Sequence, residues 1–213
     1  MTDSVRDLLG LMACGELLAF ERLAHDATLA PTLADKAELA RMAVAEFNHF
    51  ALLRTRLAEL GSAPDEAMAP FVAPLTAFHQ RTAAGNWLEG LVKAFVGDGL
   101  AADFYREISV HLDAETRTLV LDVLADTGHS AFAVDRVRAA IAADPRVAGP
   151  LALWGRRLVG EALTQAQQVA AEREALTALV IGGPGLDLNE IGRMLTRLTD
   201  GHSARMAALG LDA

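Results

Sequence analysis

The sequence has little of what many fold and function classes require. One residue of 213 is cysteine, Cys14, which rules out an internal disulfide framework. Aromatic residues make up only 5% and β-branched runs are scarce, whereas Ala and Leu are prominent, which favours helices over sheets. No uncharged apolar run reaches about 18 residues, and Asp3 and Asp7 interrupt the start, so we expect no membrane span and no signal peptide. The composition predicts a soluble, cytoplasmic, all-α protein.

The chain is also short of positive charge, with a net charge of -9. A deficit of Lys and Arg disfavours broad nucleic-acid binding, which relies on these residues to neutralise phosphates. One basic stretch remains as a local candidate for tRNA, although solvated helix-face charge is the simpler interpretation. Its members are Arg136, Arg138, Arg146, Arg156 and Arg157.

Helical periodicity and capping signals divide the chain into six expected helices. Thr32, Asn86 and Asp113 are the expected N-caps, and Gly61 is the expected stop of the second helix. Three prolines in 61–85 argue against one long straight helix there, so we expect a crossover with a short helix at about 75–82. The six expected helices span about 4–28, 32–60, 86–111, 113–142, 149–180 and 187–208.

The order of these helices is hairpin, long connection, hairpin. That connectivity is typical of a four-helix bundle with one long crossover. We expect a single domain over 1–213, with a bundle core at about 4–143 and two additional C-terminal helices at about 149–208. The sequence does not place the last two helices, which either cover one side of the bundle or form a homodimer contact.

Two carboxylate-x-x-His units are the most informative motif. Glu46 precedes His49, and 80 residues later Asp126 precedes His129. Each unit has a further acid on the preceding expected helix, at comparable height in an antiparallel pair. One such unit is common on exposed helix faces, but two at matching register are much rarer by chance. The six candidate metal ligands are Glu16, Glu46, His49, Asp98, Asp126 and His129.

These six residues fall on apolar seams spaced by three and four, so we expect their side chains to point inward. Buried carboxylates are normally paired or bound to metal, and the chain has only two lysines, Lys36 and Lys93. Two divalent cations would neutralise four carboxylates. Acids with imidazoles suit iron, with manganese as the alternative. The sequence therefore predicts a dinuclear metal site, and two neighbours, Asp122 and Tyr105, are candidates for an outer shell around it.

The stretches GELLAFERLAHDA, MAVAEFNHFALL, WLEGLVKAFVGDGLAADFYREI and VLADTGHSAFAV carry a family resemblance. They resemble the ferritin-like superfamily and, more closely, the tRNA methylthio-adenosine hydroxylase (MiaE-like) family, over about residues 5–175. The resemblance implies the same six ligands and oxygen-dependent chemistry. The usual site has four glutamates, whereas here Asp98 and Asp126 stand in the second half. Because aspartate reaches less far, that half requires closer helices, water-mediated ligation or weaker binding.

Two hypotheses for function follow. The first is a di-iron oxidoreductase of the hydroxylase type, in which Glu46 and Asp126 bridge the ions and Glu16 and Asp98 are terminal. It would act on a small-molecule or modified-nucleoside substrate and take electrons from an external reductase or ferredoxin. The second is a ferritin-like binding or structural module with a degenerate or merely structural metal, which the two aspartates suggest.

Overall fold

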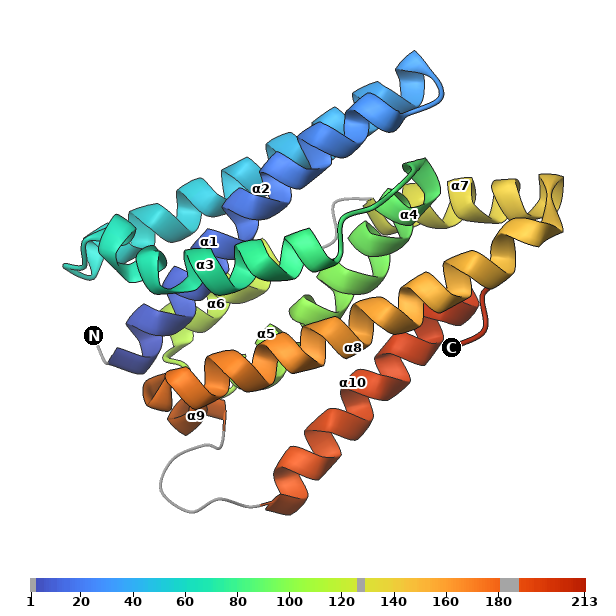
Figure 1. Cartoon of the computed structure of the whole chain (residues 1–213). Coiled ribbons are helices and arrows are strands. Elements are labelled where there is room, and N and C mark those ends of the chain that lie inside the picture. Colours follow the sequence, from blue (N-terminus) through green and yellow to red (C-terminus); the bar gives the residue numbers. More distant parts are fainter. Residues whose placement is uncertain (1–2, 126–128, 181–187) are drawn as a thin grey trace. The chain divides into compact units, whose positions relative to one another are not determined.

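Helices account for all the regular secondary structure in the part of the chain that the structure describes. The computed structural model describes residues 3–125, 129–180 and 188–213 (Figure 1). Its elements are α1 (Asp3–Asp26), η1 (Ala27–Leu29), α2 (Leu33–Glu59), α3 (Pro64–Arg81), α4 (Trp87–Val92), η2 (Lys93–Gly97), α5 (Asp98–Ser109), α6 (Ala114–Val123), α7 (His129–Ala143), η3 (Pro145–Val147), α8 (Ala148–Glu172), α9 (Glu174–Val180) and α10 (Leu188–Leu209). The all-α class predicted from the sequence is confirmed. None of these described helices is both long enough and apolar enough to cross a membrane.

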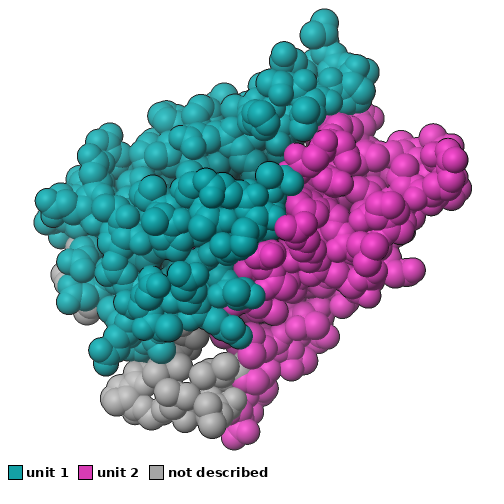
Figure 2. Space-filling view, in the orientation of Figure 1, with its two compact units in different colours: residues 1–83, 164–184 teal, residues 84–163, 185–213 magenta. Residues whose placement is uncertain are grey.

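The chain divides into two compact units, coloured separately in Figure 2. The first comprises residues 1–83 and 164–184. In it, α1 packs against α2 and α3, and α9 packs against α1. Its core includes Leu8, Met12, Leu39, Leu53 and Phe71, all at most 1% exposed. Arg173 also contacts α1 and α3, since its guanidinium lies 3.8 Å from the Asp7 carboxylate and 5.4 Å from the Phe71 ring centroid.

The second unit comprises residues 84–163 and 185–213, so α8 contributes to both units. Within it, α10 packs against α5, α7 and η2, and α4 packs against α7. Trp154 of α8 donates its indole N–H to the carbonyl of Glu89 at 3.0 Å. A Cβ atom at Gly155 would lie 2.5 Å from the Met206 sulfur, so this glycine permits close packing of α8 on α10.

The capping predictions are confirmed by the backbone geometry. Thr32, Asn86 and Asp113 each accept a hydrogen bond from the backbone N–H three residues on, at 3.0–3.1 Å. Gly61 follows α2 with a φ of 77°, a left-handed conformation that glycine adopts without strain. The capping residues predicted from the sequence therefore mark the starts of three helices, and Gly61 marks the end of the second.

The prediction for residues 61–85 is wrong, because α3 runs unbroken through Pro70 and Pro74. A proline inside a helix costs about 3 kcal/mol through its missing N–H and its ring. The two prolines are four residues apart, so both missing N–H groups fall on one side of the helix. Ala67, Met68 and Phe71 are buried, and α3 packs against α1. Burial of this apolar face offsets the local cost.

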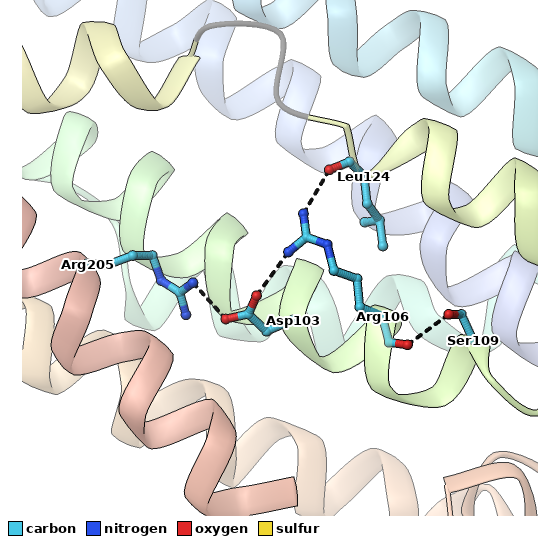
Figure 3. A network of polar contacts seen from close by, with 5 residues as sticks. All are labelled: Asp103, Arg106, Ser109, Leu124 and Arg205. Carbon is cyan, nitrogen blue, oxygen red and sulfur yellow. Dashed lines mark hydrogen bonds and ion pairs between the residues drawn. The ribbon is translucent and has the colours of Figure 1, made fainter.

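The prediction of one helix over 113–142 is also wrong. α6 ends at Val123, and Leu124 adopts φ -85° and ψ 3°, outside the helical region. Just past the helix end, the Leu124 carbonyl accepts a hydrogen bond from the Arg106 side chain at 3.0 Å (Figure 3). The predicted fifth helix is likewise two helices, α8 and α9, separated at Arg173.

Candidate metal centre

Three of the six predicted ligands come together between α1 and α2. The Nδ1 atom of His49 lies 3.5 Å from Oε2 of Glu16 and 3.5 Å from Oε2 of Glu46. One ligand atom from each residue lies within 4.8 Å of the others. The side chains are only 13–15% exposed, so they are largely withdrawn from solvent. The structure therefore brings the predicted first half-site together as one cluster.

Regular helix geometry explains why these residues converge. Glu46 and His49 are one turn apart on α2, and residues three apart share a helix face. Met12 and Leu23 on α1, with Met42 and Leu53 on α2, are at most 2% exposed. The polar cluster thus interrupts an apolar seam, as the three-and-four spacing predicts.

The cluster fits a divalent cation by its chemistry. Ligand atoms about 2.0–2.2 Å from one ion lie no more than about 4.4 Å apart, and Nδ1 of His49 lies 3.5 Å from an oxygen of each glutamate, within that limit. Two carboxylates supply negative charge that a divalent ion would cancel, and the imidazole supplies a neutral donor. Glu16, Glu46 and His49 would hold the ion.

Burial and mutual hydrogen bonding shift the pKa values in this cluster. Burial raises the pKa of the Glu16 carboxyl well above its usual range, opposed by its hydrogen bond with His49. Hydrogen bonds with Glu16 and Glu46 raise the pKa of His49 to about 9. Burial would raise the pKa of Glu46, but hydrogen bonds with His49 and Glu16 outweigh it and lower the value to about 2. A proton at neutral pH is therefore retained on His49 and competes with a metal ion.

Binding of a divalent ion is expected to release protons and to strengthen as pH rises toward 9. A metal ligand must be deprotonated, and the raised pKa of His49 means that its proton leaves when an ion binds at pH 7. Affinity should rise about tenfold per pH unit for each proton released. Calorimetric Mn²⁺ titration in buffers of different ionisation enthalpy measures this number. Binding at pH 7 without proton release would contradict the assignment of His49 as a ligand.

Sequence reasoning missed a buried cation beside the cluster. Arg22 of α1 has a side chain only 8% exposed and lies 3.7 Å from Asp26, four residues on. Its charge contributes to the low pKa of Glu46. The sequence signal that could have predicted this buried ion pair is an arginine four residues before an aspartate within an apolar stretch. Lys93 is also buried, at 3% exposed, so the chain brings more cations inside than its composition suggests.

The predicted second half-site differs from expectation in the part that the structure describes. Asp98 is exposed, although we predicted that it points inward. Asp126 lies outside the described residues, and of His129 only its place at the start of α7 is described. The two outer-shell candidates are placed, with Asp122 exposed and Tyr105 half-buried.

The π-helical turn η2 explains the exposure of Asp98. A π turn adds about one residue relative to an α turn, so the side chains after it rotate by about 100°. Leu91 is buried before η2 and Ala94 within it, and after η2 the buried positions of α5 are Leu100, Ile108 and Ser109. Ala101, three residues after Asp98, is exposed as well. Such turns are frequent at functional sites, and this one directly precedes a predicted ligand.

Comparison with known proteins places the chain in a family. A family model described as a ferritin-like domain of actinomycetes matches residues 1–183. The chain belongs to this ferritin-like family. No curated protein matches it.

A solved structure agrees with the ferritin-like assignment. It is described as protein 19 with aldehyde deformylating oxidase activity from Synechococcus, and it superposes with a TM-score of 0.74. The two chains are 21% identical, and the match covers 100% of this chain and 94% of that one. The predicted ferritin-like helical fold is therefore confirmed, whereas the narrower MiaE-like placement stays a prediction.

Proposed function

We propose that this ferritin-like protein is an oxygen-dependent di-iron oxidoreductase of the hydroxylase type. The observation that carries the proposal is the convergence of Glu16, Glu46 and His49 in a largely buried cluster. The fold shared with a protein of aldehyde deformylating oxidase activity supports the oxidative class. The predicted second ion would be held by Asp98, Asp126 and His129, with manganese as the alternative metal.

Each residue of the described cluster has a role in this proposal. Two ferrous ions, when bound, would supply the reduction of dioxygen that leads to oxidation of a substrate C–H bond. Glu46 would bridge the ions, Glu16 would be a terminal ligand, and His49 would donate its imidazole nitrogen to one ion. Hydrogen bonds with His49 and Glu16, with a smaller contribution from the charge of Arg22, lower the pKa of Glu46 and so favour its ionised, metal-binding form. The apolar seam on either side of the cluster excludes water.

The chain contains no nucleotide or flavin motif, so we propose that electrons come from a separate reductase or ferredoxin. The substrate class remains a small molecule or a modified nucleoside. A tRNA substrate is less favoured because the basic stretch is largely engaged within its own unit. Arg138 and Arg156 donate to the carbonyls of Ala208 and Asp212, and Arg146 pairs with Asp144. A homodimer remains an expectation, which the mass in solution would test.

Metal content of freshly purified protein is the decisive test. Expression in iron-supplemented medium is expected to yield two iron ions per chain and absorption changes when the reduced protein meets dioxygen. Manganese supplementation in parallel measures metal preference. A well-folded protein with no bound metal from either medium would remove the proposal.

The second candidate function is a binding or structural module with one structural ion or none. The exposure of Asp98 favours it, because among described residues only three ligands converge. One tightly bound ion that leaves the reduced protein unreactive toward dioxygen would favour this module. Two ions with dioxygen-dependent spectra would favour the oxidoreductase.

A further inference from the structure

Helix α2 carries a second apolar face on its exposed side. Its inner face packs on α1 through residues such as Leu39 and Leu53, each at most 1% exposed. On the exposed side, apolar residues recur at spacings of four and three. We call six of them the outer seam: Leu33, Ala37, Ala40, Val44, Phe47 and Ala51. Leu33 is 85% exposed, Val44 56% and Phe47 44%. Large side chains exposed at this spacing are typical of a helix that packs against another helix.

The outer seam has the same spacing when it is read in either direction. Successive members lie four, three, four, three and four residues apart. A second copy of α2 running antiparallel therefore matches the seam position for position. The matched pairs are Leu33 with Ala51, Ala37 with Phe47 and Ala40 with Val44. Each large side chain meets an alanine of the other copy, so the side chains of the two helices can interlock at close approach.

The distribution of charge on α2 also favours contact between two copies on this side. The chain has a net charge of -9, so two copies repel each other on average. Between Leu33 and Leu52, all within the described residues, the acids of α2 are buried or half-buried, and the exposed charged residues are Lys36 and Arg41. Arg41 is paired with Glu38 of the same helix. Two copies therefore meet at the outer seam without acids facing acids.

The outer seam has the area of a weak dimer rather than a permanent one. Its ends lie 18 residues apart, or about 27 Å along a helix. Half the circumference of a helix about 11 Å wide is about 17 Å, so each copy contributes about 450 Å² and the pair about 900 Å². Stable interfaces bury about 1,200–2,000 Å² in total. We therefore expect a dissociation constant on the order of 10 µM.

We propose that α2 docks on α2 of a second copy of this chain, antiparallel and through the outer seam, to form a two-fold symmetric dimer. The seam matches itself when reversed, as an interface between two identical surfaces requires, and this property selects a second copy over an unrelated partner. The contact differs from the sequence-based alternative, in which the last two helices form the dimer. It stands whether or not Glu16, Glu46 and His49 bind metal.

Sedimentation equilibrium of the full chain from about 1 to 300 µM measures the dimer. Val44 belongs to the central pair, so Val44→Lys brings two lysines close to Arg41 and its copy. Like charges at the contact should weaken dimerisation about 100-fold or more. Val110→Lys is the matched control, because Val110 at the end of α5 is 55% exposed and lies outside the seam. It should dimerise as the wild type does. A monomeric wild type over this range, or equal weakening in both folded variants, would overturn the inference.

Introduced cysteines distinguish the antiparallel contact from a parallel one. In the double variant Leu33→Cys/Ala51→Cys, position 33 of one copy faces position 51 of the other, so mild oxidation should give a disulfide-linked dimer on non-reducing electrophoresis. Within one chain the two positions are about 27 Å apart, too far for a disulfide. In Ala51→Cys alone the two copies of position 51 are also about 27 Å apart, so no link should form. Native Cys14 is only 2% exposed and does not compete. A linked dimer in Ala51→Cys alone, or none in the double variant, contradicts the antiparallel contact.

Discussion

Under the proposed function, replacing Glu46 or His49 with Ala is expected to abolish iron binding between α1 and α2 and, with it, any dioxygen-dependent activity. Each change removes one of three ligands whose atoms lie within 4.8 Å of one another. Mutating a residue that only orients a metal ligand typically lowers metal affinity about 10–100-fold, so the loss of a direct ligand should lower it more. Iron analysis after desalting and anaerobic Fe²⁺ titration measure the loss.

Both variants should remain folded, because the two polar side chains of the cluster that remain in each variant can still hydrogen-bond with each other. In Glu46→Ala, His49 keeps its 3.5 Å contact with Glu16, and in His49→Ala the two carboxyls share a proton. Glu21→Ala is the matched control, since Glu21 is an exposed acid on the same helix as Glu16. Far-ultraviolet circular dichroism checks helix content. Unchanged iron in both Glu46→Ala and His49→Ala would show that these residues bind no ion.

The first half of the candidate site could be predicted from the sequence because regular rules govern it. α1 and α2 are unbroken helices, so spacing by three and four fixes which side chains share a face. The hairpin turn fixes their relative height, and Thr32 and Gly61 set the limits of α2. Nothing beyond helix periodicity and turn position was needed to bring Glu16, Glu46 and His49 together.

The second half could not be predicted in the same way. The inward orientation of Asp98 assumed an α-helical register through residues 93–97, and the π turn there rotates everything after it. No residue pattern in that stretch distinguishes a π turn from an α turn. Just past the end of α6, the Leu124 carbonyl accepts a hydrogen bond from Arg106, which lies 18 residues away in the sequence, so local signals did not indicate this contact.

The prediction for the segment that forms α3 was wrong for the opposite reason, because it gave local signals too much weight. Pro70 and Pro74 disfavour a helix, but burial of Phe71 and its neighbours against α1 outweighs them. The close approach of α1 and α3 that permits this burial requires a residue without a side chain. Gly10 supplies it, in a helix where Ala would otherwise be favoured.

Gly10→Ala is therefore expected to destabilise the protein, by about 1–3 kcal/mol as for other overpacked cores. A Cβ atom at Gly10 would lie 2.2 Å from the carbonyl oxygen of Ala67 and 2.7 Å from its carbonyl carbon. These are backbone atoms, so no rotamer change relieves the clash and α3 must move away from α1. The free energy of unfolding in urea measures the loss, with an unchanged m-value as evidence of two-state unfolding.

Gly15→Ala is the matched control on the same helix. No described atom outside its own helical turn lies within 4 Å of a Cβ at this position, so the added methyl group meets open space. Replacing an unconstrained helical glycine should stabilise the protein by about 0.5–1 kcal/mol, because Ala loses less backbone entropy on folding. The two substitutions should thus shift the free energy of unfolding in opposite directions. Equal shifts would mean that α1 and α3 do not approach as closely as the Gly10–Ala67 contact requires.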